Sequence, residues 1–318
     1  MLAIAWARTS IAVEPPITAI EVATEHKIVF TASQSGLTIR RMQDLKPLKT
    51  LDCGLDHIHD LALSLDGQQL LVSGGSPAEV GIVQCRRVPG LQLLWENRDA
   101  DDVVTSLAWE PTDETNRSQQ STRFAAASWD RMVRTYRVEK QLPSLECVYT
   151  GHSAPVSTVA FLERGLVLSA GSDETLQVWQ WTKESSAGKQ TSLVRNLHQH
   201  TAGVITAAVQ SASSTSAKLW TASSSEDRTV RVWDAAAGRM LRFKKWPTVP
   251  QSLAWIPQTK RLVVGCEDGE LAVMDATDVS FQRVTKLSGP VSELIIESDG
   301  KSCLAVVGSS VIRSSLPD

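Results

Sequence analysis

The stretch TASSSEDRTVRVWD, residues 221–234, is the most informative part of the sequence for the fold. It begins with small residues that suit a tightly packed strand and continues through an acidic turn at Glu226 and Asp227. It ends in an alternating segment that closes with Trp233 and Asp234. Alternation with a period of two is typical of a strand with two different faces. The stretch therefore predicts a β-hairpin, and less regular copies of it occur elsewhere in the chain.

Acidic turns recur along the sequence at a nearly constant spacing. The turn aspartates are Asp130, Asp173, Asp227 and Asp268, and successive ones are separated by 43, 54 and 41 residues. Two of these spacings match the repeat of about 40–45 residues of a four-stranded propeller blade. The longer spacing contains two polar insertions, at 183–192 and 211–217, which surface loops tolerate at little cost. The 318 residues therefore accommodate about seven such units.

Each unit contains an inner strand of alternating apolar residues, a second strand of small apolar residues and a third alternating strand. We expect the inner strands at residues 17–22, 58–64, 103–109, 156–162, 204–209, 252–256 and 291–296. No helical periodicity longer than about two turns competes with this pattern. The predicted fold is an all-β, seven-bladed β-propeller. We expect it to form a single domain over residues 1–318, with blades at 17–56, 57–101, 102–154, 155–202, 203–248, 249–289 and 290–318.

Specific motifs in the fourth and fifth units resemble those of the WD40-repeat (G-beta-like) family. The strand that ends in Trp233 and Asp234 resembles the WD dipeptide strand, and Gly151-His152 resembles the GH dipeptide. In that family, His, Ser or Thr, Asp and Trp form a buried hydrogen-bonded tetrad within a blade. The resemblance implies two structural tetrads here, which are His152, Ser169, Asp173 and Trp179, and His200, Ser223, Asp227 and Trp233. The small-residue spacers resemble those of short stand-alone bacterial WD40 proteins.

The seventh unit ends after its third strand, near residue 316. Propellers of this family close their ring by overlap, so we expect residues 2–12 (LAIAWARTSIA) to supply the missing outer strand of the last blade. Closure in this way removes exposed strand edges.

Composition argues against several functional classes. The net charge of −3 disfavours a nucleic-acid binder, which would carry clustered Lys and Arg. The five scattered cysteines show no CxxC spacing, so we expect no metal, no cofactor and no disulfide framework. The apolar run near the N-terminus is too short for a signal peptide or a membrane span. We therefore expect a cytoplasmic protein that does not bind a membrane.

The residue types of the first tetrad, His152, Ser169 and Asp173, also match those of a hydrolytic triad. Their positions favour the structural tetrad, and the sequence contains no G-x-S-x-G elbow and no phosphate-binding glycine loop. His198 and His200 lack further ligands nearby, which disfavours a metal site. We therefore predict that the protein is not an enzyme.

Partner binding is expected on the face where first strands begin and where second and third strands are joined. Trp129 stands beside a charged turn and Trp246 precedes a proline, and exposed aromatic residues of this kind often mark interaction hot spots. Alternatively, both rings pack over the rim of a neighbouring blade. The candidate partner-binding residues are His57, Asp101, Asp102, Trp129, Arg131, Glu226, Trp246 and Glu267.

The sequence thus predicts a non-catalytic scaffold or adaptor that presents a rigid propeller face to a protein or peptide. The acidic surroundings of the face favour a basic segment as the partner. One alternative is an obligate structural subunit of a larger multiprotein assembly, which would expose hydrophobic side chains on the outer rim. Another is a ligand-binding or enzymatic propeller, which would need converging ionisable residues in the central channel. Fold alone does not distinguish these functions.

Overall fold

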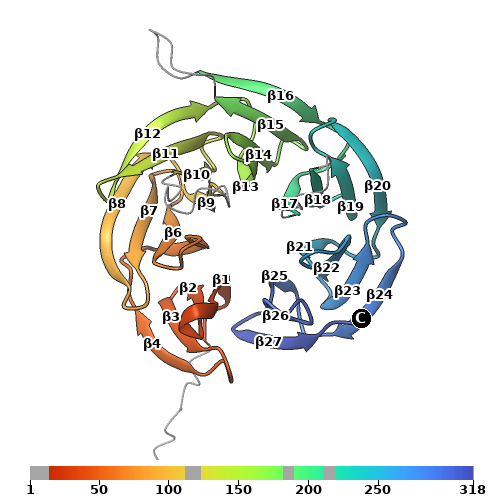
Figure 1. Cartoon of the computed structure of the whole chain (residues 1–318), viewed down its shortest axis with the longest axis horizontal. Helices are drawn as coiled ribbons and strands as arrows, with labels where there is room; N and C mark the ends of the chain where they lie inside the picture. Colours follow the sequence, from red (N-terminus) through yellow and green to blue (C-terminus); the bar gives the residue numbers. More distant parts are fainter. Residues whose placement is uncertain (1–13, 112–122, 182–189, 211–218, 318) are drawn as a thin grey trace, which may run out of the picture.

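The computed structural model describes residues 14–111, 123–181, 190–210 and 219–317. Its strands form six four-stranded sheets and one three-stranded sheet, all with antiparallel neighbours. Figure 1 shows the sheets arranged radially around a centre, with the first strand of each sheet innermost. This is the all-β, seven-bladed propeller that the sequence predicts.

The blades are numbered in chain order. The first four blades consist of β1 (Ile17–Ala23), β2 (Ile28–Ser33), β3 (Gly36–Arg41) and β4 (Pro47–Leu51); β5 (His57–Leu63), β6 (Gln69–Ser76), β7 (Val80–Arg87) and β8 (Gln92–Ala100); β9 (Val104–Trp109), β10 (Arg123–Ser128), β11 (Val133–Glu139) and β12 (Leu142–Tyr149); and β13 (Val156–Glu163), β14 (Leu166–Gly171), β15 (Leu176–Trp181) and β16 (Thr191–Leu197). A short 3-10 helix, η1 (Thr24–His26), connects β1 to β2.

Blades five to seven follow the same plan. They consist of β17 (Val204–Val209), β18 (Trp220–Ser225), β19 (Thr229–Asp234) and β20 (Arg239–Lys245); β21 (Pro250–Trp255), β22 (Arg261–Cys266), β23 (Glu270–Asp275) and β24 (Phe281–Lys286); and β25 (Val291–Ile296), β26 (Ser302–Val307) and β27 (Ser310–Ser315). These bounds lie within two residues of the expected inner strands. The expected closing strand at 2–12 lies outside the described residues.

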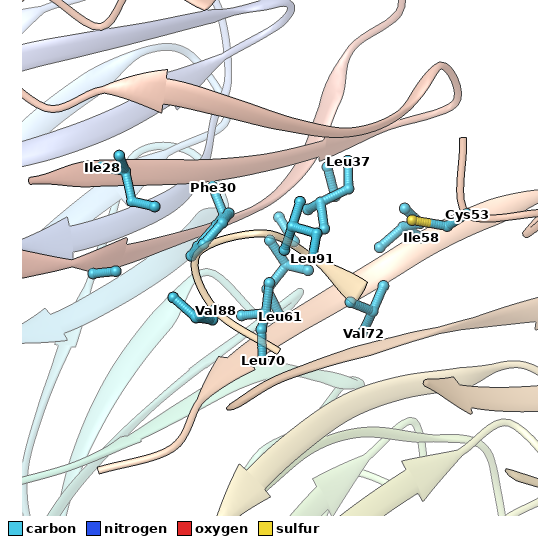
Figure 2. Packing of buried hydrophobic residues seen from close by; sticks show 13 residues of the cluster. Ile28, Phe30, Leu37, Cys53, Ile58, Leu61, Leu70, Val72, Val88 and Leu91 are labelled. Carbon is cyan, nitrogen blue, oxygen red and sulfur yellow. The ribbon is translucent and has the colours of Figure 1, made fainter. Parts of the chain in front are cut away.

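The hydrophobic core is divided among the junctions between blades. Seven clusters of buried apolar side chains each join two neighbouring blades. Figure 2 shows the cluster between blades one and two, where Phe30 and Leu37 lie near Leu61 and Leu70. Second strands are buried on both faces, as in WTASSS of β18. Small residues fit there because each second strand is sandwiched between two blades.

Polar bonds between inner strands reinforce this packing. The Thr105 hydroxyl donates to the Val156 carbonyl of the next blade at 2.7 Å, and Ser157 donates to Val204 at 2.7 Å. Thr18 and Ser252 make equivalent bonds to Ile58 and Val291. These bonds fix the spacing of the inner strands around the ring axis.

The ring is closed by contacts between blades seven and one. The Ile17 N–H donates to the Gly308 carbonyl at 2.8 Å. The Arg313 guanidinium of β27 donates to the carbonyls of Met42 and Gln43, which follow β3. It also pairs with Glu297 at 2.8 Å. None of the described helices has the length and hydropathy needed to cross a membrane.

Candidate functional site

The first predicted tetrad comes together within blade four. The His152 ring precedes β13, with Nδ1 2.8 Å from Asp173 Oδ2 and Nε2 2.8 Å from Ser169 Oγ. The Trp179 indole N–H donates to the same Ser169 oxygen at 3.1 Å. Asp173 follows β14 in the turn and also accepts from the Thr175 hydroxyl. Every polar group of the set therefore has a partner, as buried polar groups require.

Blade five repeats this arrangement. His200 Nδ1 lies 2.9 Å from Asp227 Oδ2, and Nε2 lies 2.7 Å from Ser223 Oγ. The Trp233 indole N–H donates to Ser223 Oγ at 2.9 Å. Arg231 adds a cation 3.5 Å from Asp227.

The pKa values and the burial of the tetrad residues fit a structural role within each blade. Burial disfavours the charge on Asp173, but hydrogen bonds from His152 and Thr175 outweigh this and lower the pKa of the carboxyl. The pKa of Asp227 is lowered well below its usual range for the same reason. Burial lowers the pKa of His200 despite the nearby Asp227. Ser169 and Ser223 have no exposed surface, so neither hydroxyl can reach a substrate.

In blade three, an ion pair and a stacked ring take the place of the tetrad. The side chains of Asp130 and Arg134 form a buried ion pair at 2.7 Å. Tyr136 takes the position of the tryptophan and stacks on Phe124, with ring centroids 4.8 Å apart.

The predicted partner-binding residues occupy one end of the ring, on turns and strand starts of several blades. Asp102 is half-buried, and its carboxylate accepts from the Ala78 N–H at 2.9 Å. Trp129 is 41% exposed, and its ring lies 5.9 Å from that of His59, at the start of blade two. Glu226 and Glu267 lie in the turns of blades five and six. The exposed candidates are His57, Asp101, Trp129, Arg131, Glu226 and Glu267.

The assignment of Trp246 to an exposed interaction surface is wrong. Its side chain is only 3% exposed and belongs to the core between blades five and six. The ring lies 5.1 Å from that of Phe281, on β24. The segment that leads into β21 turns inward here, so the proline that follows Trp246 does not place the ring at the surface. Packing against the neighbouring blade, the alternative named above, describes this residue.

The axial channel contains groups that the sequence prediction missed. A cavity of about 220 Å³ is lined by inner-strand residues from blades two to seven, including Asp60 and Glu293. The Asp60 carboxylate accepts from the Leu107 N–H of blade three at 2.7 Å, and Glu21 accepts from the Leu63 N–H of blade two at 3.2 Å. These two carboxylates therefore join neighbouring inner strands. The missed signal was three acidic residues within otherwise apolar inner strands.

Burial strongly affects these carboxyl groups. It raises the pKa of Glu21 to about 7 and that of Asp60 to about 6, although backbone N–H donors oppose the shift in both. It raises the pKa of Glu293 to about 8, with the nearby Asp60 adding to the effect. In the described ranges, no three His, Cys, Asp or Glu side chains are grouped to hold a metal ion.

Exposed apolar side chains gather on the outer strands. Of the nine large hydrophobic side chains that are exposed among the described residues, seven lie on fourth strands. We call these seven the outer-rim set, and they are Leu48, Leu93, Leu142, Leu145, Leu193, Phe243 and Phe281. Figure 1 shows these strands at the perimeter of the ring.

Comparison with known proteins identifies WD40 repeats in this chain. The sequence model of the family described as WD domain, G-beta repeat matches residues 144–180 and 191–234, which contain all eight residues of the two tetrads. These two segments, in blades three to five of the propeller, therefore match WD40 repeats.

The similar proteins are eukaryotic. Human Coronin-7 is 28% identical over 64% of this chain, and the match spans only 16% of Coronin-7. The ribosome biogenesis protein YTM1 of Meyerozyma guilliermondii is 33% identical over 39% of this chain and 26% of its own length. The crystal structure of RRP9 WD40 repeats superposes with a TM-score of 0.79 at 17% identity, over 96% of each chain, which establishes the shared fold. These relatives give no support to the expected resemblance to bacterial proteins.

Proposed function

We propose that this chain is a non-catalytic structural subunit of a larger protein assembly. The observation that carries the proposal is the outer-rim set. These exposed apolar side chains lie on the outermost strands, where another subunit could contact the outer edge of the ring. Contiguous exposed apolar surface marks sites of protein association. Leu142, the most exposed of the set, and Leu145 both lie on β12, and Leu193 lies on the neighbouring β16.

The names of similar proteins support the same proposal. YTM1 is named as a ribosome biogenesis protein, and ribosome biogenesis is a process of large assemblies. A role for this chain in such a process would favour a nuclear site of action over the cytoplasmic one that the sequence predicts.

The adaptor function predicted from the sequence is the second candidate. It is favoured by Trp129, which is exposed beside His59 and the acidic residues Asp101 and Asp102. A large ring in such a position can anchor a partner segment. The preference for a basic segment belongs to this candidate.

Sedimentation of the tagged full chain from its native cells separates the two functions. We expect the wild-type chain to sediment with a particle far larger than its own 34.6 kDa. The triple change Leu142→Ser, Leu145→Ser and Leu193→Ser should release it to the monomer position, whereas Trp129→Ala should not. Leu65→Ser is the matched control, because Leu65 is 76% exposed but lies outside the outer-rim set.

A wild-type chain that sediments as a free monomer would contradict the subunit proposal. Release by Trp129→Ala, with the triple variant still in the particle, would favour the adaptor instead. Equal melting temperatures of the purified variants would show that each change acts on association and leaves folding intact.

A further inference from the structure

The lining of the axial channel is polar and one-sided in charge. Among the described residues, it contains the carboxyl groups of Asp60 and Glu293 and no lysine or arginine. Hydroxyl groups surround them on five inner strands, from Thr105 and Ser106 on β9 to Ser292 on β25. The single imidazole is that of His59, whose pKa is lowered by burial and by the nearby His57, so it does not supply a cation near neutral pH.

The carboxyl groups near the channel differ in what they bind. Asp60 and Glu21 accept hydrogen bonds from backbone N–H groups of the next blade. Glu293 lies at the position on β25 that Asp60 holds on β5, each being the residue after a β-bulge. In the part of the chain that the structure describes, no hydrogen bond or ion pair reaches its carboxyl group. The residue at the same position in blade one, Ala19, has no polar side chain to offer.

A desolvated carboxyl group without a partner is unfavourable, since buried charges are normally paired. Burial raises the pKa of Glu293 to about 8, so much of it is protonated at neutral pH. A cation that enters the channel would stabilise the ionised form and release that proton. The surrounding hydroxyl oxygens and the Gln251 side-chain carbonyl can accept N–H donors from the same group.

We propose that the axial channel binds one ammonium or guanidinium group, with the Glu293 carboxylate as its counter-ion. The cavity of about 220 Å³ has room for one side chain of that kind. The cation is carried either by a basic side chain of a protein or by a free amine. This site lies at the ring axis, away from the outer-rim set, and does not depend on the assembly proposed above.

Calorimetric titration of the purified full chain tests the site. The probes are the capped tripeptides Ala-Arg-Ala and Ala-Lys-Ala, free spermidine, and capped Ala-Gln-Ala as the neutral control. We expect at least one cationic probe to bind and the neutral one to fail. Affinity should be higher at pH 8.5 than at pH 6.5, because the proton on Glu293 competes with the cation. Glu293→Gln should weaken binding about tenfold or more, since a charge-assisted bond is lost.

Two further variants keep the test specific. Glu25→Gln removes an exposed carboxylate outside the channel and should bind as the wild type does. Glu293→Asp should retain part of the affinity. Binding by the tripeptides alone identifies a protein side chain as the source, and binding by spermidine alone identifies a free amine. Failure of every cationic probe, or an equal affinity in Glu293→Gln, would overturn the proposal.

Discussion

Two junctions of the ring are stabilised by different contacts: the junction of blades four and five, and the junction of blades seven and one. The junction of blades four and five has a core of nine buried apolar residues, and each of these blades contains a hydrogen-bonded tetrad. Within the described ranges, the junction of blades seven and one has five buried apolar residues. It depends instead on the Ile17–Gly308 backbone bond and on Arg313. Family-like motifs therefore mark the best-braced part of the ring, and the seam is held by polar contacts.

Trp233→Ala should have the largest effect on stability. It removes a fully buried ring and leaves Ser223 without its indole donor, which should cost about 3–5 kcal/mol. Trp129→Ala is the matched control, and we expect it to cost within about 1 kcal/mol because the ring is largely at the surface. Urea unfolding of both variants measures the difference. Equal losses would mean that the tetrad does not brace its blade.

Arg313→Ala should have an intermediate effect at the seam. Three acceptors on two blades lose their donor, at a cost of about 1–2 kcal/mol. Arg98→Ala, which removes one largely exposed ion pair to Glu96 in blade two, should cost about 0–1 kcal/mol. Hydrogen exchange should show lost protection in β1 and β27 before β14 or β18. A uniform loss of protection around the ring would contradict a difference in stability between the junction of blades seven and one and blades four and five.

A third effect depends on pH. The pKa of Glu293 is raised from 4.5 to about 8, so the folded chain holds this proton more tightly than the unfolded chain. Its contribution to stability is present at low pH and is lost as pH rises towards 8. Glu293→Gln should therefore melt close to the wild type near pH 4.5 and melt at a clearly higher temperature near pH 8. Scanning calorimetry at both values measures this, and a variant that melts lower at pH 8 would contradict it.

The sequence predicted the strands well because each blade encodes its own alternation. The tetrad partners, such as His152 and Asp173, could also be named because both lie in one repeat and their spacing follows the family pattern. Trp246 was misplaced because its burial depends on Phe281, on the next blade. The spacing of residues within one repeat does not indicate which side chains are buried by contact with the next blade.

The channel escaped prediction for a related reason. Asp60 and Glu293 belong to inner strands at opposite ends of the chain, and only ring closure brings them to one cavity. Their charge within apolar strands was the one signal available. The outer-rim set was anticipated as a criterion for a structural subunit, but which side chains stay exposed could be known only from the folded edges.

The Arg313 contacts have a consequence for how the chain is made. The guanidinium bonds to carbonyls of Met42 and Gln43, which precede it by 271 and 270 residues. At about 5–20 residues per second of synthesis, blade one waits roughly 14–54 s before that side chain exists. During this time the apolar flank of blade one that later packs on Leu304 and Val306 lacks these two partners. Blade one is therefore the first blade to be made, and its contacts with the last blade are among the last to form.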